Sequence, residues 1–190
     1  MKQLKQREAN NRKLHGNTGI KKAGIYLQGK EQGKTKTIYM ACAWFNEEQT
    51  KMMNEGYKKL KANPTVDWEN SYRPLEHQYA GINVEEHPEW MRRVDWQAMT
   101  FKSDVSGMAG SDVGVFLYTP KTPDEGEAWE TAWLYAKGKP VVLVVPDEDY
   151  GKVAINLMPA IGATDIIKLS ELEHYNFNKV YQTTYHGDIY

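Results

Sequence analysis

"TPDEGEAWETAWLYAKGKPVVLVV" (residues 122–145) contains an acidic turn, a helix and an uncharged strand in direct succession. The spacing predicts a helix over residues 124–137, because Asp124 is a typical N-terminal cap and Gly138, with Pro140 beyond it, is a typical stop. The run PVVLVV carries no charge, which is typical of a strand buried on both faces of a parallel sheet. This stretch therefore predicts an α/β fold.

The rest of the chain repeats this alternation. Largely apolar runs predict three further strands, in TIYMACAWF (37–45), DVGVFLY (112–118) and TDIIKL (164–169). Helices are expected after Asn46 up to Pro64, from His87 at least to Lys102, in a short turn at INLMPAIG (155–162) and in SELEHY (170–175), while residues 66–86 look irregular. The pattern predicts an α/β protein whose parallel sheet has helices on both faces.

Charge is distributed unevenly along the 190 residues. The net charge is −1, but residues 1–36 carry ten Lys and Arg against two Glu, so the remainder is acidic. We expect residues 1–34 to be a basic, flexible extension and residues 35–190 to form the folded domain. A solvated arm is favoured over an RNA-binding tail, and the acidic domain argues against a nucleic acid polymer as partner.

The composition also limits the possible cofactors and compartments. Cys42 is the single cysteine, which excludes an internal disulfide and a multi-cysteine zinc site. The five histidines show no metal-ligand spacing, so neither a metal nor another cofactor is expected. No apolar run approaches the length of about 20 residues that spans a bilayer, and no signal peptide is recognisable. A cytoplasmic protein that does not contact membranes is expected.

The acidic turn lies where an α/β protein binds ligands, because it follows the carboxyl end of the strand that ends near Tyr118. Asp124 and Glu127 have the spacing of a capping box, and Glu125 and Glu127 are expected to be solvated charges favoured by the helix dipole. Glu130 borders the expected apolar face of the helix and can point back across the strand ends. That face is expected to consist of Trp129, Ala132, Trp133 and Ala136.

From Thr37 to Tyr190 the chain resembles the nucleoside 2-deoxyribosyltransferases, specifically the class acting on both purine and pyrimidine deoxynucleosides. The resemblance is carried by stretches that occur in order along the chain: KTIYMACAWF, NPTVDWENSYRPLEHQYAGI, EEHPEW, KSDVSGM, VGVFLY, PDEDYGK, INLM, YNFN and the terminal GDIY. It implies a flavodoxin-like fold, assembly as a homohexamer built from dimers, and transfer of 2-deoxyribose between nucleobases. Deoxynucleosides and free nucleobases are the implied small-molecule partners.

The resemblance also implies roles for individual residues. Glu130 matches the nucleophile, Tyr39 the hydroxyl that holds and polarises it, and Asp104 the acid that faces the nucleobase. The matches for substrate binding are Gln78 and Phe45 for the base, Asp124 for the sugar hydroxyls, and Asn156 and the carboxylate of Tyr190, delivered by a neighbouring subunit, for the 5′ end of the sugar.

The chemistry implied is double displacement at the anomeric carbon, in which a carboxylate nucleophile and an acid on the leaving group give retention of configuration. Two alternatives stay open: an N-glycoside hydrolase of 2′-deoxynucleosides or deoxynucleotides, in which water captures the intermediate, and a non-catalytic nucleotide-binding module. Without the resemblance, Tyr39 is equally well a core aromatic and Asp104 a polar residue near a helix end.

Overall fold

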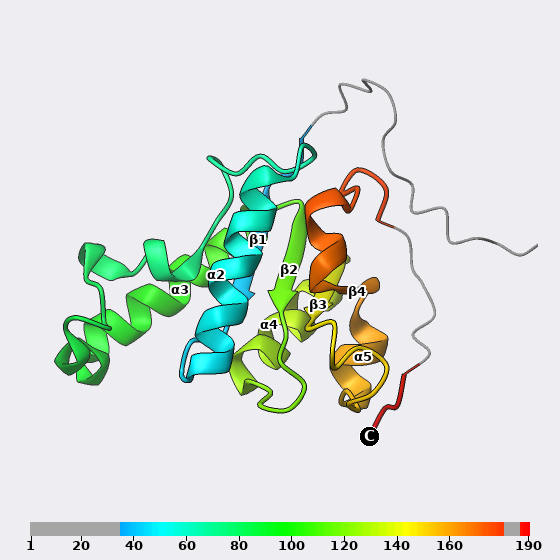
Figure 1. The fold of residues 1–190 in the computed structure, drawn as a ribbon. Coiled ribbons are helices and arrows are strands. Elements are labelled where there is room, and N and C mark those ends of the chain that lie inside the picture. Colours follow the sequence, from blue (N-terminus) through cyan, green and yellow to red (C-terminus); the bar gives the residue numbers. More distant parts are fainter. Residues whose placement is uncertain (1–34, 181–186) are drawn as a thin grey trace, which may run out of the picture.

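The computed structural model describes residues 35–180 and 187–190, and its centre is a parallel sheet of four strands (Figure 1). These are β1 (Ile38–Cys42), β2 (Val113–Leu117), β3 (Val141–Val145) and β4 (Asp165–Lys168), in the order β1-β2-β3-β4. Every residue of β1, β2 and β3 is buried, as their lack of charge predicts. The expected basic extension at residues 1–34 lies outside the described residues.

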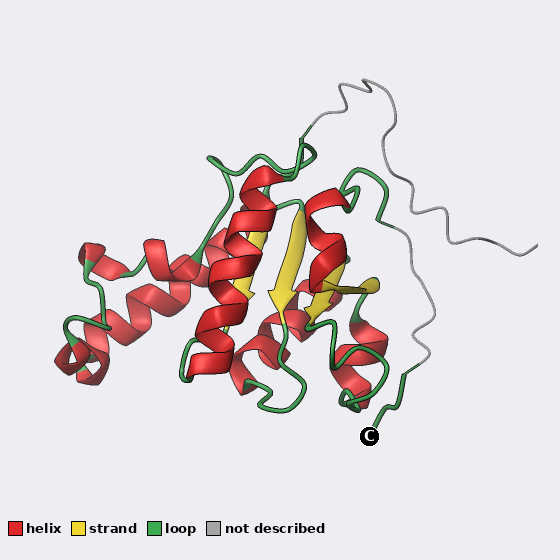
Figure 2. Ribbon diagram, viewed as in Figure 1, coloured by secondary structure: helices red, strands yellow, loops and turns green. Residues whose placement is uncertain are grey.

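Helices cover both faces of this sheet, which confirms the predicted α/β layering (Figure 2). The helices are α2 (Glu47–Ala62), α3 (Val94–Gly110), α4 (Glu125–Ala136) and α5 (Leu157–Gly162), with 3₁₀ turns at Pro74–Glu76, Tyr79–Gly81, Pro88–Arg92 and Leu169–His174. One apolar core joins the sheet to α2 and the last 3₁₀ turn, and the other joins it to α3, α4 and α5. No helix in the described ranges is long and apolar enough to cross a membrane.

The predicted helix boundaries are largely correct, because the caps form. The side chains of Asn46 and Asp124 accept hydrogen bonds from the first turns of α2 and α4, and Gly138 takes a φ of +67° just after α4. The helix expected from His87 is instead interrupted, because Arg93 is extended and separates the 3₁₀ turn from α3. The last predicted helix is a 3₁₀ turn.

A fifth segment runs along the free edge of β1. Residues 65–72 form parallel bridges at Lys36–Val66 and Tyr39–Tyr72. The amide of Tyr72 donates to the carbonyl of Ile38 at 2.8 Å, and the amide of Met40 donates to the carbonyl of Tyr72 at 2.9 Å. With this segment counted as second in sequence, the order across the sheet becomes 2-1-3-4-5, the flavodoxin-like order, whose ligand crevice lies between the first and third strands. Here these are β1 and β2.

Candidate active site

Tyr39 and Glu130 form the centre of the candidate site. Alternate residues of β1 face opposite sides of the sheet, so Tyr39 and Ala41 point toward the layer of α3 and α4 while Ile38 and Met40 point toward α2. The Tyr39 hydroxyl donates a hydrogen bond of 2.7 Å to Oε1 of Glu130, which lies in the second turn of α4. The predicted contact between the two side chains is present.

Asp104 lies on the neighbouring helix, α3, and its carboxyl is also bound by a tyrosine hydroxyl. The hydroxyl of Tyr72 donates to Oδ1 of Asp104 at 3.1 Å. The rings of Tyr39 and Tyr72 stack, with 5.6 Å between their centroids and 11° between their planes. Two adjacent tyrosines therefore each hold one carboxyl group, and the carboxyls of Asp104 and Glu130 lie close enough for their charges to interact.

Burial dominates the protonation of both carboxyls. It raises the pKa of Glu130 to about 7, against the hydrogen bond from Tyr39, and the charges of Asp104 and Asp124 raise it further. Burial likewise raises the pKa of Asp104 to about 6, while the hydrogen bond from Tyr72 and the nearby His77 lower it. The pKa of Tyr39 is raised by burial and by Glu130, so Tyr39 remains a hydrogen-bond donor. Such poised acids are typical of catalytic sites.

Asp124 caps α4 at the end of the loop that follows β2. Its Oδ2 accepts a hydrogen bond of 2.9 Å from the amide of Glu127. A Cβ at position 126 would lie 2.8 Å from the same oxygen, so Gly126 leaves room for the carboxylate of Asp124.

The prediction that Glu127 is a solvated charge is wrong. Its side chain is only 3% exposed, and its Oε1 accepts a hydrogen bond of 3.1 Å from the amide of Ala43 in the loop after β1. Its Oε2 is buried and has no hydrogen-bond partner among the described residues. Burial, Asp124 and Glu130 raise its pKa well above the ordinary value. Only Glu125 is exposed as predicted.

The apolar face expected for α4 is only partly correct, because Trp133 packs against the core while Trp129, Ala132 and Ala136 are exposed. The buried stripe consists of Glu127, Thr131 and Leu134, which have the helical spacing i, i+4, i+7. Trp129 is 47% exposed and packs on Phe101 of α3, with 5.5 Å between ring centroids. Trp129 misled the prediction, and the regular spacing of the stripe was the signal that would have identified Glu127.

Three predicted sugar-binding residues share one hollow. A cavity of about 620 Å³ between α4, α5 and the chain end is lined by Asp124, Asn156 and Tyr190, and also by Tyr118, which was not predicted. The chain end is marked C in Figure 1. The side chain of Asn156 caps α5, because its Oδ1 accepts a hydrogen bond of 3.0 Å from the amide of Met158. The carbonyl oxygen of Tyr190 accepts a hydrogen bond of 2.8 Å from the amide of Leu157, so the last residue is held in place.

The two predicted base-binding residues lie on loops. Gln78 is buried, and its Oε1 accepts a hydrogen bond of 3.1 Å from the amide of Val84, which leaves its NH₂ group for other contacts. Phe45 is 65% exposed and packs on Trp44. Sequence reasoning missed Gln49, which joins two loops of the site. Its side-chain oxygen accepts a hydrogen bond from the amide of Phe45, and its side-chain NH₂ group donates one to the carbonyl of Thr122. Hydrogen bonds within the described ranges link neither Gln78 nor Phe45 to Glu130.

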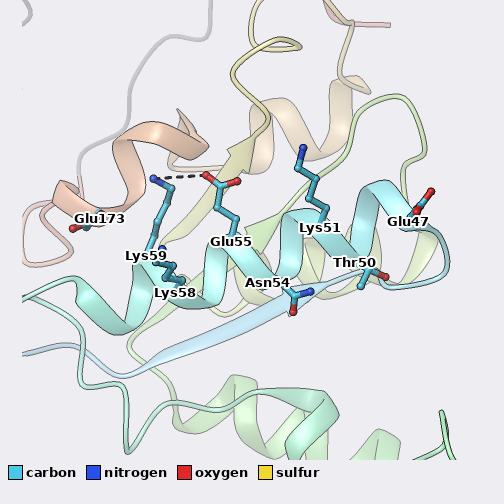
Figure 3. A pocket seen from close by; sticks show the side chains of 8 residues that line it. All are labelled: Glu47, Thr50, Lys51, Asn54, Glu55, Lys58, Lys59 and Glu173. Carbon is cyan, nitrogen blue, oxygen red and sulfur yellow. Dashed lines mark ion pairs between the residues drawn. The ribbon is translucent and has the colours of Figure 1, made fainter.

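A hollow of about 770 Å³ on the outer face of α2 offers a contrast (Figure 3). Lysines and glutamates line it, including Lys51, Lys58 and Glu47, and Lys59 forms an ion pair with Glu55 at 3.8 Å (Figure 3). These are solvated charges of both signs on a helix surface. The carboxyls of Glu130 and Asp104 lie elsewhere, beside Tyr39 and Tyr72. In the described parts of the chain, His, Cys, Asp and Glu form no group of three that could hold a metal ion.

Comparison with known proteins identifies the family of the chain. The family model described as nucleoside 2-deoxyribosyltransferase matches residues 38–163. The nucleoside deoxyribosyltransferase of Lactobacillus leichmannii is 43% identical over 155 residues, which cover 82% of this chain and 98% of the relative. The nucleoside deoxyribosyltransferase of Lactobacillus johnsonii is 43% identical over 147 residues, which cover 77% of this chain and 98% of the relative.

A solved structure extends the likeness to three dimensions. A 2-deoxyribosyltransferase from Bacillus psychrosaccharolyticus superposes with a TM-score of 0.64 at 25% identity, covering 78% of this chain and 98% of that one. The fold, the family model and the close relatives agree over the sheet and the helices that carry Tyr39, Asp104 and Glu130. The chain belongs to the nucleoside 2-deoxyribosyltransferase family.

Proposed function

We propose that this protein transfers 2-deoxyribose from a deoxynucleoside to a free nucleobase through a covalent deoxyribosyl-Glu130 intermediate, with retention of configuration. The observation that carries the proposal is the hydrogen bond from Tyr39 to Glu130, formed beside a second half-buried carboxyl, Asp104. A nucleophile and an acid at one anomeric carbon are what double displacement requires.

In the first displacement Oε2 of Glu130 attacks C1′ while Tyr39 holds Oε1. The bond from C1′ to the base breaks, its electron pair leaves with the base, and Asp104 gives the base a proton. In the second displacement the acceptor base attacks C1′, loses a proton to Asp104, and expels Glu130. Two inversions restore the original configuration, and every proton and electron pair is returned.

The substrate contacts follow from the same assignment. The NH₂ group of Gln78 and the ring of Phe45 bind the base, and Asp124 accepts hydrogen bonds from the sugar hydroxyls. Base contacts through one amide and one ring fit purines and pyrimidines alike. This fit supports the mixed-specificity class.

Association of several chains, as a homohexamer, completes the proposed site. Exposed apolar side chains surround the hollow beside α5; they are Tyr135, Leu157, Met158 and Ile161. Two chains that bury this surface against each other would deliver Asn156 and the Tyr190 carboxylate of one chain to the 5′ end of the sugar in the other. We propose that residues 35–190 form this catalytic unit, in a cytoplasmic protein.

Incubation with thymidine and adenine, followed by chromatography, tests the function. We expect 2′-deoxyadenosine and thymine in equal amounts. Thymine and free deoxyribose formed at the same rate without adenine would instead identify a hydrolase, and unchanged substrates would identify a binding module. During turnover of thymidine alone, mass spectrometry should find a deoxyribosyl group on the peptide that contains Glu130.

Substitution of the two carboxyls tests the mechanism. Glu130→Ala should lower turnover by about 10⁴-fold or more, because the nucleophile has no substitute. Glu55→Ala is the matched control, because Glu55 lies on the outer face of α2 (Figure 3). Asp104→Asn should slow departure of the base by about 10²–10⁴-fold, with partial rescue by a deoxynucleoside whose base is a better leaving group. A folded Glu130→Ala protein of normal turnover would refute the mechanism.

A further inference from the structure

Tyr72 is a half-buried titratable group that the mechanism above leaves unused, although it touches the acid Asp104. Its main chain is fixed at the sheet edge by the hydrogen bonds to Ile38 and Met40, and it forms a parallel bridge with Tyr39. Because bridged neighbours in parallel strands point to the same side, the rings of Tyr72 and Tyr39 stack. The position of the Tyr72 ring is therefore determined by the sheet.

Helix α3 has a recess that receives this ring. A Cβ at Gly107 would lie 2.4 Å from the Tyr72 ring, so only glycine allows the ring to lie against the helix there. Asp104 precedes Gly107 by three residues and therefore lies on the same face of α3. The fit of ring to helix brings the Tyr72 hydroxyl to Oδ1 of Asp104, at 3.1 Å.

His77 packs on the Tyr72 ring as well. The two rings stack with 4.4 Å between centroids and 23° between planes. Nδ1 of His77 lies 2.8 Å from the carbonyl of Arg73, and since a carbonyl only accepts, Nδ1 carries a proton. Tyr72 thus stacks against rings from two segments, and its hydroxyl oxygen could leave Asp104 only if the ring moved and broke both contacts.

We propose that Tyr72 is a positioning residue for Asp104, fixing Oδ1 of that carboxyl so that Oδ2 carries the proton given to the leaving base. The inference rests on the proposed function, because it takes Asp104 as the acid. In each turnover the Oδ2–H bond breaks as the base takes the proton, and Tyr72 keeps its own proton and its bond to Oδ1. When the acceptor base reacts, its proton returns to Oδ2.

The groups around Asp104 determine how Tyr72 affects its protonation. They are Tyr72 and His77 on the side of the edge segment, Glu130 on α4 and Tyr39 on β1. The hydrogen bond from Tyr72 stabilises the carboxylate, so its loss raises the pKa of Asp104. For a reaction that needs Asp104 protonated and Glu130 ionised, the optimum lies midway between the two pKa values. Loss of the Tyr72 hydroxyl therefore moves the optimum to higher pH.

The test is Tyr72→Phe, which keeps the ring and its stacking and removes only the hydroxyl. The matched control is Tyr175→Phe, which removes a hydrogen bond of 2.9 Å from a tyrosine to Asp165 at the opposite edge of the sheet. The pH dependence of thymidine–adenine transfer is measured for both variants and the unmodified chain. If the unmodified chain has no transfer activity, the proposed function itself is refuted. The role of Tyr72 is tested only by the difference between the variants and an active unmodified chain.

Tyr72→Phe should lower kcat by about 10–100-fold, the loss expected for a hydrogen bond to a charged group, with little change in KM. Its optimum of kcat/KM should move to higher pH, and a better leaving base should reduce the loss. Tyr175→Phe should retain both the rate and the optimum. Transfer by Tyr72→Phe within twofold of the unmodified chain, or an equal change in both variants, would overturn the proposal.

Discussion

The hydroxyl of Tyr39 lies 2.7 Å from Oε1 of Glu130, a contact across 91 residues that joins the first strand to α4. The hydrogen bond holds the carboxylate and favours its ionised form, against a burial that opposes ionisation. Removal of this single hydroxyl therefore changes both the geometry and the protonation of the proposed nucleophile.

Tyr39→Phe should lower kcat/KM for deoxyribose transfer by about 10–100-fold, because a hydrogen bond to a charged group is lost. The pKa of Glu130 should rise above its present value of about 7, so the loss should be greater at pH 6 than at pH 8. Rate measurements across this range check the prediction. An equal loss at every pH would mean that Tyr39 contributes only to packing.

The pH dependence of the unmodified protein should be bell-shaped. Activity requires Glu130 ionised and Asp104 protonated, and their pKa values lie at about 7 and about 6. Activity should therefore rise from low pH as Glu130 loses its proton, peak near pH 6.5, and fall as Asp104 becomes ionised. The pH dependence of kcat/KM gives two apparent pKa values, which belong to the coupled pair of carboxyls and not to either residue alone. A rate that still increases above pH 8 would exclude Asp104 as the acid.

Glu127→Gln should stabilise the protein at neutral pH. The raised pKa of Glu127 means that the folded state holds a proton which the unfolded chain loses above pH 4.5, so this group's contribution to stability falls as pH increases. Glutamine keeps an oxygen for the amide of Ala43 and has no proton to lose. The gain in Tm should therefore be large at pH 7 and small at pH 4.

Glu127→Ala provides the contrast, because it removes the bond to Ala43 in the loop that carries Phe45. We expect a higher KM for the nucleoside with a smaller change in kcat. Calorimetry and steady-state kinetics of the two variants check these expectations. A lower Tm for Glu127→Gln at pH 7 would contradict the burial of an unpaired acid at this position.

Gly107→Ala should destabilise the protein by about 1–3 kcal/mol, the usual cost of overpacking, because the added methyl collides with the Tyr72 ring. Gly110→Ala on the same helix is the control. A Cβ there meets nothing within 4 Å, so this change should be neutral or stabilising by about 0.4–1 kcal/mol. Urea unfolding measures both. Equal effects would mean that helix propensity, not the recess, determines the result.

Deletion of Tyr190 should lower catalytic efficiency on thymidine by about 10–100-fold, through loss of a charge-assisted hydrogen bond to the 5′-hydroxyl. The loss of catalytic efficiency should be smaller on 5′-deoxythymidine, because this substrate has no 5′-hydroxyl to form the bond. Steady-state kinetics on both substrates, with light scattering to follow oligomer size, check this expectation. Equal losses of catalytic efficiency on both substrates, with an unchanged oligomer size, would mean that Tyr190 contributes only to packing.

The local pattern of the sequence was sufficient for the strands and for most of the helices. Largely apolar runs identified β1 to β4, and Asn46 and Asp124 identified the starts of α2 and α4, because caps and strand burial depend on neighbours in sequence. The resemblance supplied Tyr39, Asp104 and Glu130. The structure then placed these side chains within reach of one another.

The interactions that the sequence did not predict link distant segments. Tyr72 reaches Asp104 only because residues 65–72 pair with β1, and an irregular segment gives no periodicity that would predict this pairing. Glu127 was misjudged because charged residues are usually exposed, whereas here one buried carboxyl satisfies the amide of Ala43. Contacts of this kind become visible only in three dimensions.

The segment beside β1 also protects the protein from aggregation. An unpaired outer strand presents free amides and carbonyls on which another chain can add a strand. Along β1 these groups are occupied in turn: the amides of Lys36 and Met40 and the carbonyls of Lys36 and Ile38 bond to residues 65–72, and the amide of Ile38 bonds to the hydroxyl of Ser71. The segment that places Tyr72 against Asp104 thereby closes an edge that would otherwise recruit further copies of the chain.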